Sequence, residues 1–114
     1  MDRERKVWGE RWIIRQDSTH ANSFLKLEKG YECSWHRHQT KYNLFVVLWG
    51  KIGIVTEQLD GRQVETVLTQ GECFTTMPGQ KHKFVVHENG AMIEEMYVEY
   101  SEADIERQNQ GGPS

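Results

Sequence analysis

Hydrophobic and polar residues alternate with a period of two along most of this chain, the pattern of β-strands that bury one face. The alternating runs are short, and turns rich in glycine separate them. We predict strands at 12–14, 24–28, 31–38, 43–49, 52–59, 62–68, 73–77, 83–88 and 91–100. Many short strands at regular spacing indicate an all-β sandwich or barrel.

Three glycines are expected to interrupt the strands. Asp60-Gly61 and Asn89-Gly90 each lie between two strand-like runs, and such pairs predict tight hairpins. Gly50 is expected to end the strand at 43–49. Glycine is suited to these positions because it takes a positive φ at little steric cost.

The strand at 43–49 is the most apolar of the chain. One face carries Asn43, Phe45, Val47 and Trp49, and the other carries Leu44, Val46 and Leu48. Both faces are largely apolar, so neither is expected to face water. One face can line a barrel, whereas the other needs a second sheet or a second subunit. We therefore predict a homodimer.

The ends of the chain are predicted to differ from its middle. Residues 1–6 are highly charged and predict a flexible lead-in to a single domain at 7–107. Residues 101–107 predict a short C-terminal helix, with Ser101 as the N-cap. Residues 108–114 (QNQGGPS) predict a flexible tail.

Composition excludes several classes of partner. The chain has 114 residues and a formal net charge of −3, which gives no reason to expect nucleic acid or an anionic membrane. No apolar run approaches the ~20 residues of a membrane span, and no signal peptide is visible, so the expected location is the cytoplasm. Cys33 and Cys73 are too few for a disulfide framework and are expected to be free thiols.

Histidines supply the candidate chemistry. His36 and His38 stand two positions apart in the predicted strand at 31–38, so both should point to the same face. His82 follows the turn at Pro78-Gly79. Three imidazoles can bind one divalent transition metal ion, for which zinc, iron, manganese and nickel are candidates. The alternative is that these are ordinary surface histidines, but their spacing from nearby glycines favours the metal site.

That spacing resembles the two motifs of the cupin superfamily. Gly30, His36, His38, Asn43 and Gly50 fit G-x5-H-x-H-x4-(E)-x6-G, and P-G-x2-H ends at His82. The resemblance implies a double-stranded β-helix, or jelly-roll, barrel that binds one metal ion through three histidines and a glutamate. The glutamate position is occupied by Asn43, a neutral and weaker ligand.

A narrower resemblance points to the type II mannose-6-phosphate isomerase cupins. Its motifs match Val7-Trp8-Gly9, Ser34-Trp35-His36-Arg37-His38, Met77-Pro78-Gly79-Gln80-Lys81-His82 and Asp104-Ile105-Glu106-Arg107. It implies metal-dependent aldose–ketose isomerisation of a sugar phosphate. Here Lys41-Tyr42-Asn43 replaces the R-x-E of that family. The D-x-Y-G-R that usually follows the D-I-x-R motif, here Asp104-Ile105-Glu106-Arg107, is absent.

An isomerase needs a metal that stabilises an enediolate, a base that moves a proton, and cations that hold the phosphate. Lys41, Lys83 and Arg107 are the candidate phosphate ligands, and Lys41 is also a catalytic candidate. Glu94, Glu95 and Glu99 are candidate bases. By alternation Glu95 and Glu99 share one face of the last strand and Glu94 lies on the other, and the sequence leaves open which face is inside.

The loss of the carboxylate ligand leaves two further interpretations open. In the first, the chain is a non-catalytic metal- or sugar-binding cupin. In the second, three histidines hold iron in a non-haem dioxygenase that acts on a small organic substrate, because some members of that class lack the carboxylate.

Overall fold

The computed structural model of the chain describes residues 2–98. Four predictions lie outside these residues: the helix at 101–107, the tail at 108–114, and the roles of Glu99 and Arg107. Within residues 2–98, no helix is long and apolar enough to cross a membrane.

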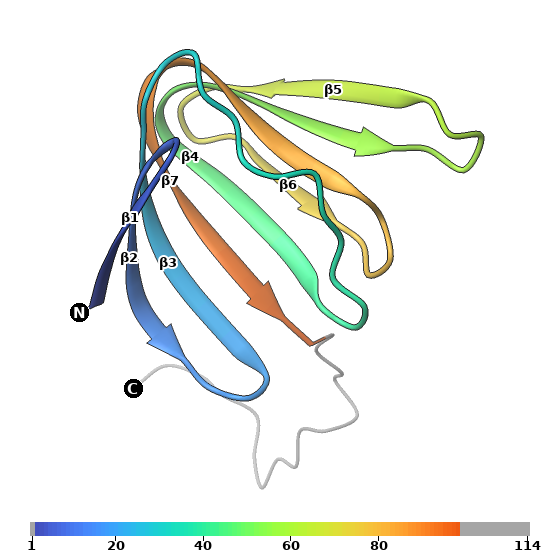
Figure 1. The fold of residues 1–114 in the computed structure, drawn as a ribbon, viewed down its shortest axis with the longest axis horizontal. Coiled ribbons are helices and arrows are strands. Elements are labelled where there is room, and N and C mark those ends of the chain that lie inside the picture. The colour runs from blue at the N-terminus through green and yellow to red at the C-terminus, as the bar shows by residue number, and fades with distance from the viewer. Residues whose placement is uncertain (1, 99–114) are drawn as a thin grey trace, which may run out of the picture.

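The described residues form one antiparallel sheet of seven strands, which curls into a jelly-roll-like barrel (Figure 1). The all-β prediction is confirmed. The strands are β1 (Asp2–Lys6), β2 (Gly9–Gln16), β3 (His20–Leu27), β4 (Tyr42–Glu57), β5 (Gln63–Leu68), β6 (Cys73–Thr76) and β7 (His82–Tyr97). Their order across the sheet is β1-β2-β3-β7-β4-β5, and β6 pairs with β4.

The two longest strands, β4 and β7, form the centre of the sheet and pair along almost their whole length. Their inward residues pack with those of β3 into one core, in which Leu25, Phe45, Val47, Phe84 and Met92 are all at least 98% buried. Alternate residues along each strand therefore define an inner face, which encloses the core, and an outer face.

Two of the predicted interruptions are wrong. β4 continues through Gly50, and β7 continues through Asn89-Gly90 without a hairpin. The two glycines lie against each other: Gly50 has a φ of 96°, and a Cβ there would lie 2.7 Å from the carbonyl oxygen of Asn89. A Cβ on Gly90 would collide with the carbonyl oxygen of Trp49. Glycine here permits the close approach of two strands rather than a turn.

The register between β4 and β7 shifts on both sides of Trp49. Trp49, predicted to share the face of Asn43, is therefore 53% exposed and lies against Phe24 of the outer face, with the ring centroids 6.4 Å apart. The hairpin at Asp60-Gly61 is confirmed, because it joins β4 to β5 and Gly61 has a φ of 84°.

Two further segments differ from the predictions. Residues 2–6, expected to be a flexible lead-in, pair with β2 as strand β1. Residues 31–38, expected to be a regular strand, make only two isolated bridges to β7, Glu32 to Val85 and His36 to His82. Most residues of this segment have no β-bridge partner. It crosses the open side of the barrel as an irregular strap (Figure 1).

Candidate metal centre

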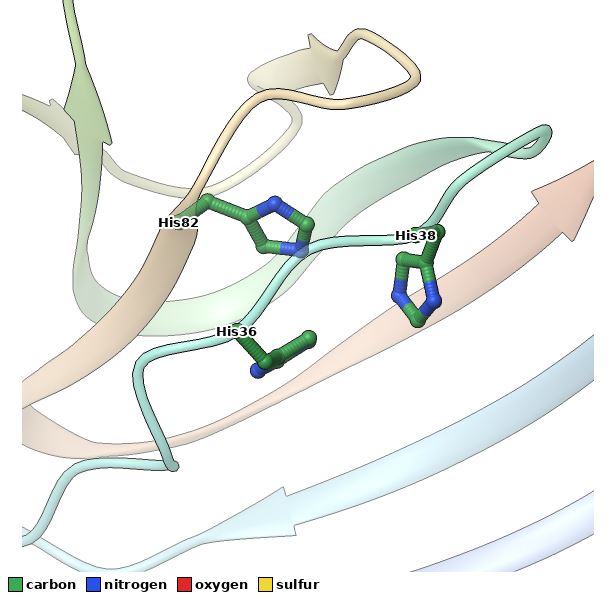
Figure 2. Close-up of side chains that lie close together, drawn as sticks. All are labelled: His36, His38 and His82. Carbon is green, nitrogen blue, oxygen red and sulfur yellow. The ribbon is translucent and has the colours of Figure 1, made fainter.

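Three histidines from two distant parts of the chain converge at this strap (Figure 2). The backbone of His36 exchanges two hydrogen bonds with that of His82, the first residue of β7, at 3.1 and 2.8 Å. His38 follows two residues later, and the three ring centroids lie 4.6–5.5 Å apart. One nitrogen of each ring lies within 4.8 Å of the corresponding nitrogen of the other two. The predicted convergence of the three side chains is therefore present.

Backbone carbonyls fix the orientation of two of these rings. Nδ1 of His36 lies 2.7 Å from the carbonyl oxygen of Ser34, and Nδ1 of His82 lies 3.0 Å from that of Gln80. A carbonyl only accepts hydrogen bonds, so each Nδ1 carries the proton and donates it. The lone pair of each neutral ring is then on Nε2, as in metal-binding histidines that are oriented by a second hydrogen bond.

The surroundings also keep two of the rings, those of His38 and His82, neutral. Burial lowers the pKa of His82 to about 4, and the nearby His36 and His38 act in the same direction. Burial lowers the pKa of His38 as well, with smaller contributions from the charges of His36 and Lys41. A neutral imidazole is the form that binds metal, so His82 and His38 are ready to act as ligands near pH 7.

Three buried polar atoms lack a partner among the described residues at this point: Nε2 of His38, Nε2 of His82 and Oδ1 of Asn43. Oδ1 of Asn43 and Nε2 of His82 present a lone pair, as does Nε2 of His38 in the tautomer that binds metal through this atom, and a buried polar atom without a partner is costly. A divalent cation held by the histidines satisfies the two nitrogens. The donor set therefore fits a transition metal ion, with imidazole nitrogen as the chief ligand type.

Asn43 lies on the inner face of β4 and is fully buried. Its Nδ2 donates a hydrogen bond of 3.5 Å to Oε2 of Glu94, on the inner face of the neighbouring β7. Burial raises the pKa of Glu94, although the charge of Arg11 and the hydrogen bond from Asn43 oppose the shift. A carboxylate is thus present on this face, but on β7, and it is not part of the three-histidine cluster.

A cavity of about 400 Å³ opens beside His36 and His38. That volume lies in the range of small-molecule sites. The ionisable side chains of its wall, apart from the thiol of Cys33, are those of Lys6, Arg11, Glu32, His36, His38 and Glu94.

Comparison with known proteins decides the family. A family model described as "Cupin domain" matches residues 23–94. The chain belongs to the cupin family. No curated protein matches this cupin.

Solved structures share the fold of this cupin at low sequence identity. KdgF from Halomonas is 16% identical, with a TM-score of 0.70 over 88% of this chain and 90% of that one. An RmlC-like cupin from Shewanella frigidimarina is 22% identical, with a TM-score of 0.71 over 91% of this chain and 88% of that one. A variant of oxalate decarboxylase from Bacillus subtilis is 14% identical, with a TM-score of 0.71 over 85% of this chain and 27% of that one. These likenesses show the jelly-roll fold.

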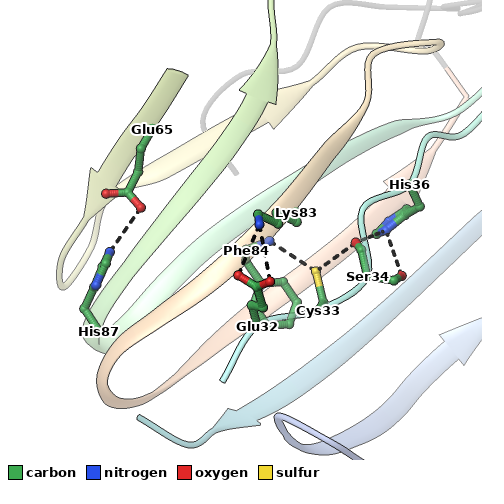
Figure 3. A network of polar contacts seen from close by, with 8 residues as sticks. All are labelled: Glu32, Cys33, Ser34, His36, Glu65, Lys83, Phe84 and His87. Carbon is green, nitrogen blue, oxygen red and sulfur yellow. Dashed lines mark hydrogen bonds and ion pairs between the residues drawn. The ribbon is translucent and has the colours of Figure 1, made fainter. Parts of the chain in front are cut away.

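Three other predicted site residues of this cupin, Glu95, Lys83 and Lys41, do not line the cavity. Glu95 is on the outer face of β7, where it pairs with Nε2 of His20 at 3.2 Å. Nζ of Lys83 pairs with Oε2 of Glu32 at 3.2 Å (Figure 3). Lys41 is half-buried and close enough to influence the pKa of His38, but it does not line the cavity. The structure thus places Glu94, rather than Glu95, beside the histidines.

Two residues gained importance only from the structure. Alternation along β7 separates Glu94 from Glu95, but the inner face becomes known only from the pairing of Glu94 with Phe45 and Ser23. Arg11 gave no signal in the sequence, because it belongs to a strand that carries two other charged residues, Glu10 and Arg15. Alternation from Trp12, whose ring contacts Phe24 on the outer face, would have placed Arg11 inside.

Proposed function

We propose that this cupin binds one divalent transition metal ion through His36, His38 and His82 and uses it to hold a small molecule in the adjoining cavity. The observation that carries the proposal is the pair of buried Nε2 atoms, on His38 and His82, that have no partner among residues 2–98. The δ-nitrogen of His82 is already committed to a carbonyl, so its Nε2 is left for a ligand.

The reaction that we propose is aldose–ketose isomerisation of a sugar phosphate, as in the type II mannose-6-phosphate isomerases that the sequence motifs resemble. The metal supplies a positive charge that holds two neighbouring oxygens and stabilises negative charge between them. Glu94 moves the proton between the two carbons. Two observations support this role for Glu94. Its side chain lines the cavity, and burial raises its pKa toward neutral pH, where a general base is most effective.

One observation favours a second candidate. Among the described residues, the cluster of three histidines includes no carboxylate, so a bound metal keeps its full charge of about +2. Three-histidine iron sites of this kind suit oxygen activation on a small organic substrate. The two candidates differ in the metal and in the second reactant.

The experiment starts with metal analysis of chain purified without chelator. A stoichiometric divalent metal supports the proposed site, and the absence of binding after reconstitution with zinc, iron, manganese or nickel contradicts it. The loaded protein is then assayed for interconversion of mannose 6-phosphate and fructose 6-phosphate. Oxygen uptake by the iron form, without isomerisation, favours the dioxygenase instead. A cupin that binds metal but shows neither activity is a binding protein.

We further propose that the outer face packs against a second copy. Phe24, Ile93 and Val46 lie side by side there on β3, β7 and β4, and Trp49 is half-exposed beside them. Covering such a patch removes apolar area from water. Light scattering is expected to give a dimer mass, and Val46→Lys is expected to shift it to the monomer. A monomer mass at every concentration would contradict the proposal.

A further inference from the structure

Arg11 is held inside the barrel by a buried hydroxyl. It lies on β2 opposite Leu25, so it shares the inner face with the core. Its Nε donates a hydrogen bond of 3.1 Å to Oγ of Ser23, which is 1% exposed. One edge of the guanidinium is therefore fixed, and the group forms part of the cavity wall beside the metal centre.

The other charges of the cavity wall are mostly paired. Nζ of Lys6 lies 2.9 Å from Oε2 of Glu4, and Glu32 pairs with Lys83. Within residues 2–98, Arg11 forms no ion pair, and its terminal nitrogens have no hydrogen-bond partner. Glu94 is near enough for the charge of Arg11 to lower its pKa, but the two side chains do not form an ion pair. The fork of the guanidinium is free to bind a ligand.

We propose that Arg11 binds the anionic group of the small-molecule ligand whose other end lies at the three histidines, an inference that rests on the proposed metal site. A guanidinium offers two parallel N–H donors that match a carboxylate or a phosphate. The three histidines add no negative charge, so a metal of charge about +2 and Arg11 together exceed the single charge of the Glu94 carboxylate in the same wall, and a ligand anion balances the excess.

This assignment defines a ligand class. The ligand is a small organic molecule with a carboxylate or phosphate at one end and neighbouring hydroxyl or carbonyl oxygens at the other. Arg11 thereby takes the role that the sequence assigned to Lys41 and Lys83, which lie outside the cavity wall.

The test uses three polyols with the same six-carbon chain. Sorbitol is neutral, gluconate carries a carboxylate, and sorbitol 6-phosphate carries a phosphate. Calorimetry on the full chain, with and without one equivalent of zinc, is expected to show about tenfold tighter binding of at least one anion than of sorbitol. Whichever anion binds tighter assigns the group as carboxylate or phosphate. Equal affinity for all three polyols would overturn the proposal.

Variants of Arg11 identify the residue responsible. Arg11→Met is expected to abolish the preference for the anion, whereas Arg15→Met, a control at an exposed arginine of the same strand, keeps it. Arg11→Lys retains a charge without the fork and is expected to weaken the preference without abolishing it. If Arg11→Met does not fold, Arg11→Lys tests whether the anion preference depends on Arg11. An unchanged preference in a folded Arg11 variant overturns the proposal.

The zinc-free arm separates this inference from the proposed function. If zinc does not bind but the anion preference and its dependence on Arg11 persist, the metal site fails and the anion site stands. If zinc binds and no Arg11 variant alters the preference, the metal site stands and the anion site fails.

Discussion

Glu94 and Glu95 are neighbours on β7 with opposite surroundings. Glu94 is on the inner face, where Asn43 donates to it and burial raises its pKa. Glu95 is on the outer face and pairs with His20. The two side chains have the same chemistry, so the difference comes from strand alternation alone. A single step along a strand here separates a candidate base from a carboxylate that contacts a histidine on the outer face.

The histidines divide in the same way. His36 on the strap and His82 on the inner face of β7 direct Nδ1 to backbone carbonyls, which leaves Nε2 for a ligand. On the outer face, Nε2 of His20 lies 3.2 Å from Glu95, and Nε2 of His87 lies 3.2 Å from Glu65 (Figure 3). The partner of each ring thus distinguishes a histidine whose Nε2 is left for a ligand from one whose Nε2 contacts a carboxylate.

Exchanging each glutamate for glutamine tests the comparison most strongly. Glu94→Gln is expected to lower kcat for sugar-phosphate isomerisation about 10²–10⁴-fold, because glutamine cannot accept the proton. Glu95→Gln is expected to leave kcat within about twofold, since its side chain lies on the other face. Steady-state kinetics on metal-loaded protein measures both, and equal losses would show that alternation does not separate their roles.

Removing one histidine from each face has the next largest effect. His82→Ala is expected to weaken divalent metal binding by about 100-fold or more, because a ligand contributes at least as much as the groups that orient it. His87→Ala removes a ring of the same size that pairs with Glu65 and is expected to bind metal as the wild type does. Competition with a chelating dye gives both affinities. Similar losses in the two variants would contradict the site.

The lowered pKa of His82 predicts that the stability of the metal-free chain depends on pH. The pKa of His82 is about 4 in the folded state, against an ordinary value of 6.5. Between these values the unfolded chain holds a proton that the folded chain does not, so stability falls as pH falls. The loss is about 2–3 kcal/mol between pH 7 and pH 4.

Urea unfolding of wild type and His82→Gln at pH 7, 5.5 and 4.5 measures the contribution of His82 to the change in stability with pH. The raised pKa of Glu94 acts in the opposite direction in both proteins, so the difference between their slopes isolates the histidine. Parallel slopes would show that His82 is not held neutral by the fold.

The sequence was sufficient for the elements that local chemistry determines. Alternation gave the all-β class, and Asp60-Gly61 gave its hairpin. The spacing of His36, His38 and His82 gave the cluster, although the supporting strand is an irregular strap. Turn chemistry misplaced Asn89-Gly90, because the glycine serves close contact with Trp49 on another strand.

The roles of Glu94 and Arg11 could not be predicted from the sequence, because they depend on the pairing of strands that are distant in the chain. The inner position of Glu94 follows from its neighbours Ser23 and Phe45 on two other strands, and local sequence does not encode that register. The same holds for Arg11, whose role depends on the buried Ser23.

Asn43→Glu tests whether the inner face can regain the ligand that its sequence lacks. A carboxylate at this buried position is expected to tighten metal binding by about tenfold, because it adds a negative ligand to three neutral ones. The new carboxylate also loses the hydrogen bond to Glu94 and faces its charge. The double variant Asn43→Glu/Glu94→Gln removes that repulsion and is expected to bind metal more tightly still. Leu44→Glu, one step along β4 on the outer face, is the matched control and should leave the affinity unchanged. Unchanged affinity in both Asn43 variants would show that this side chain does not face the metal.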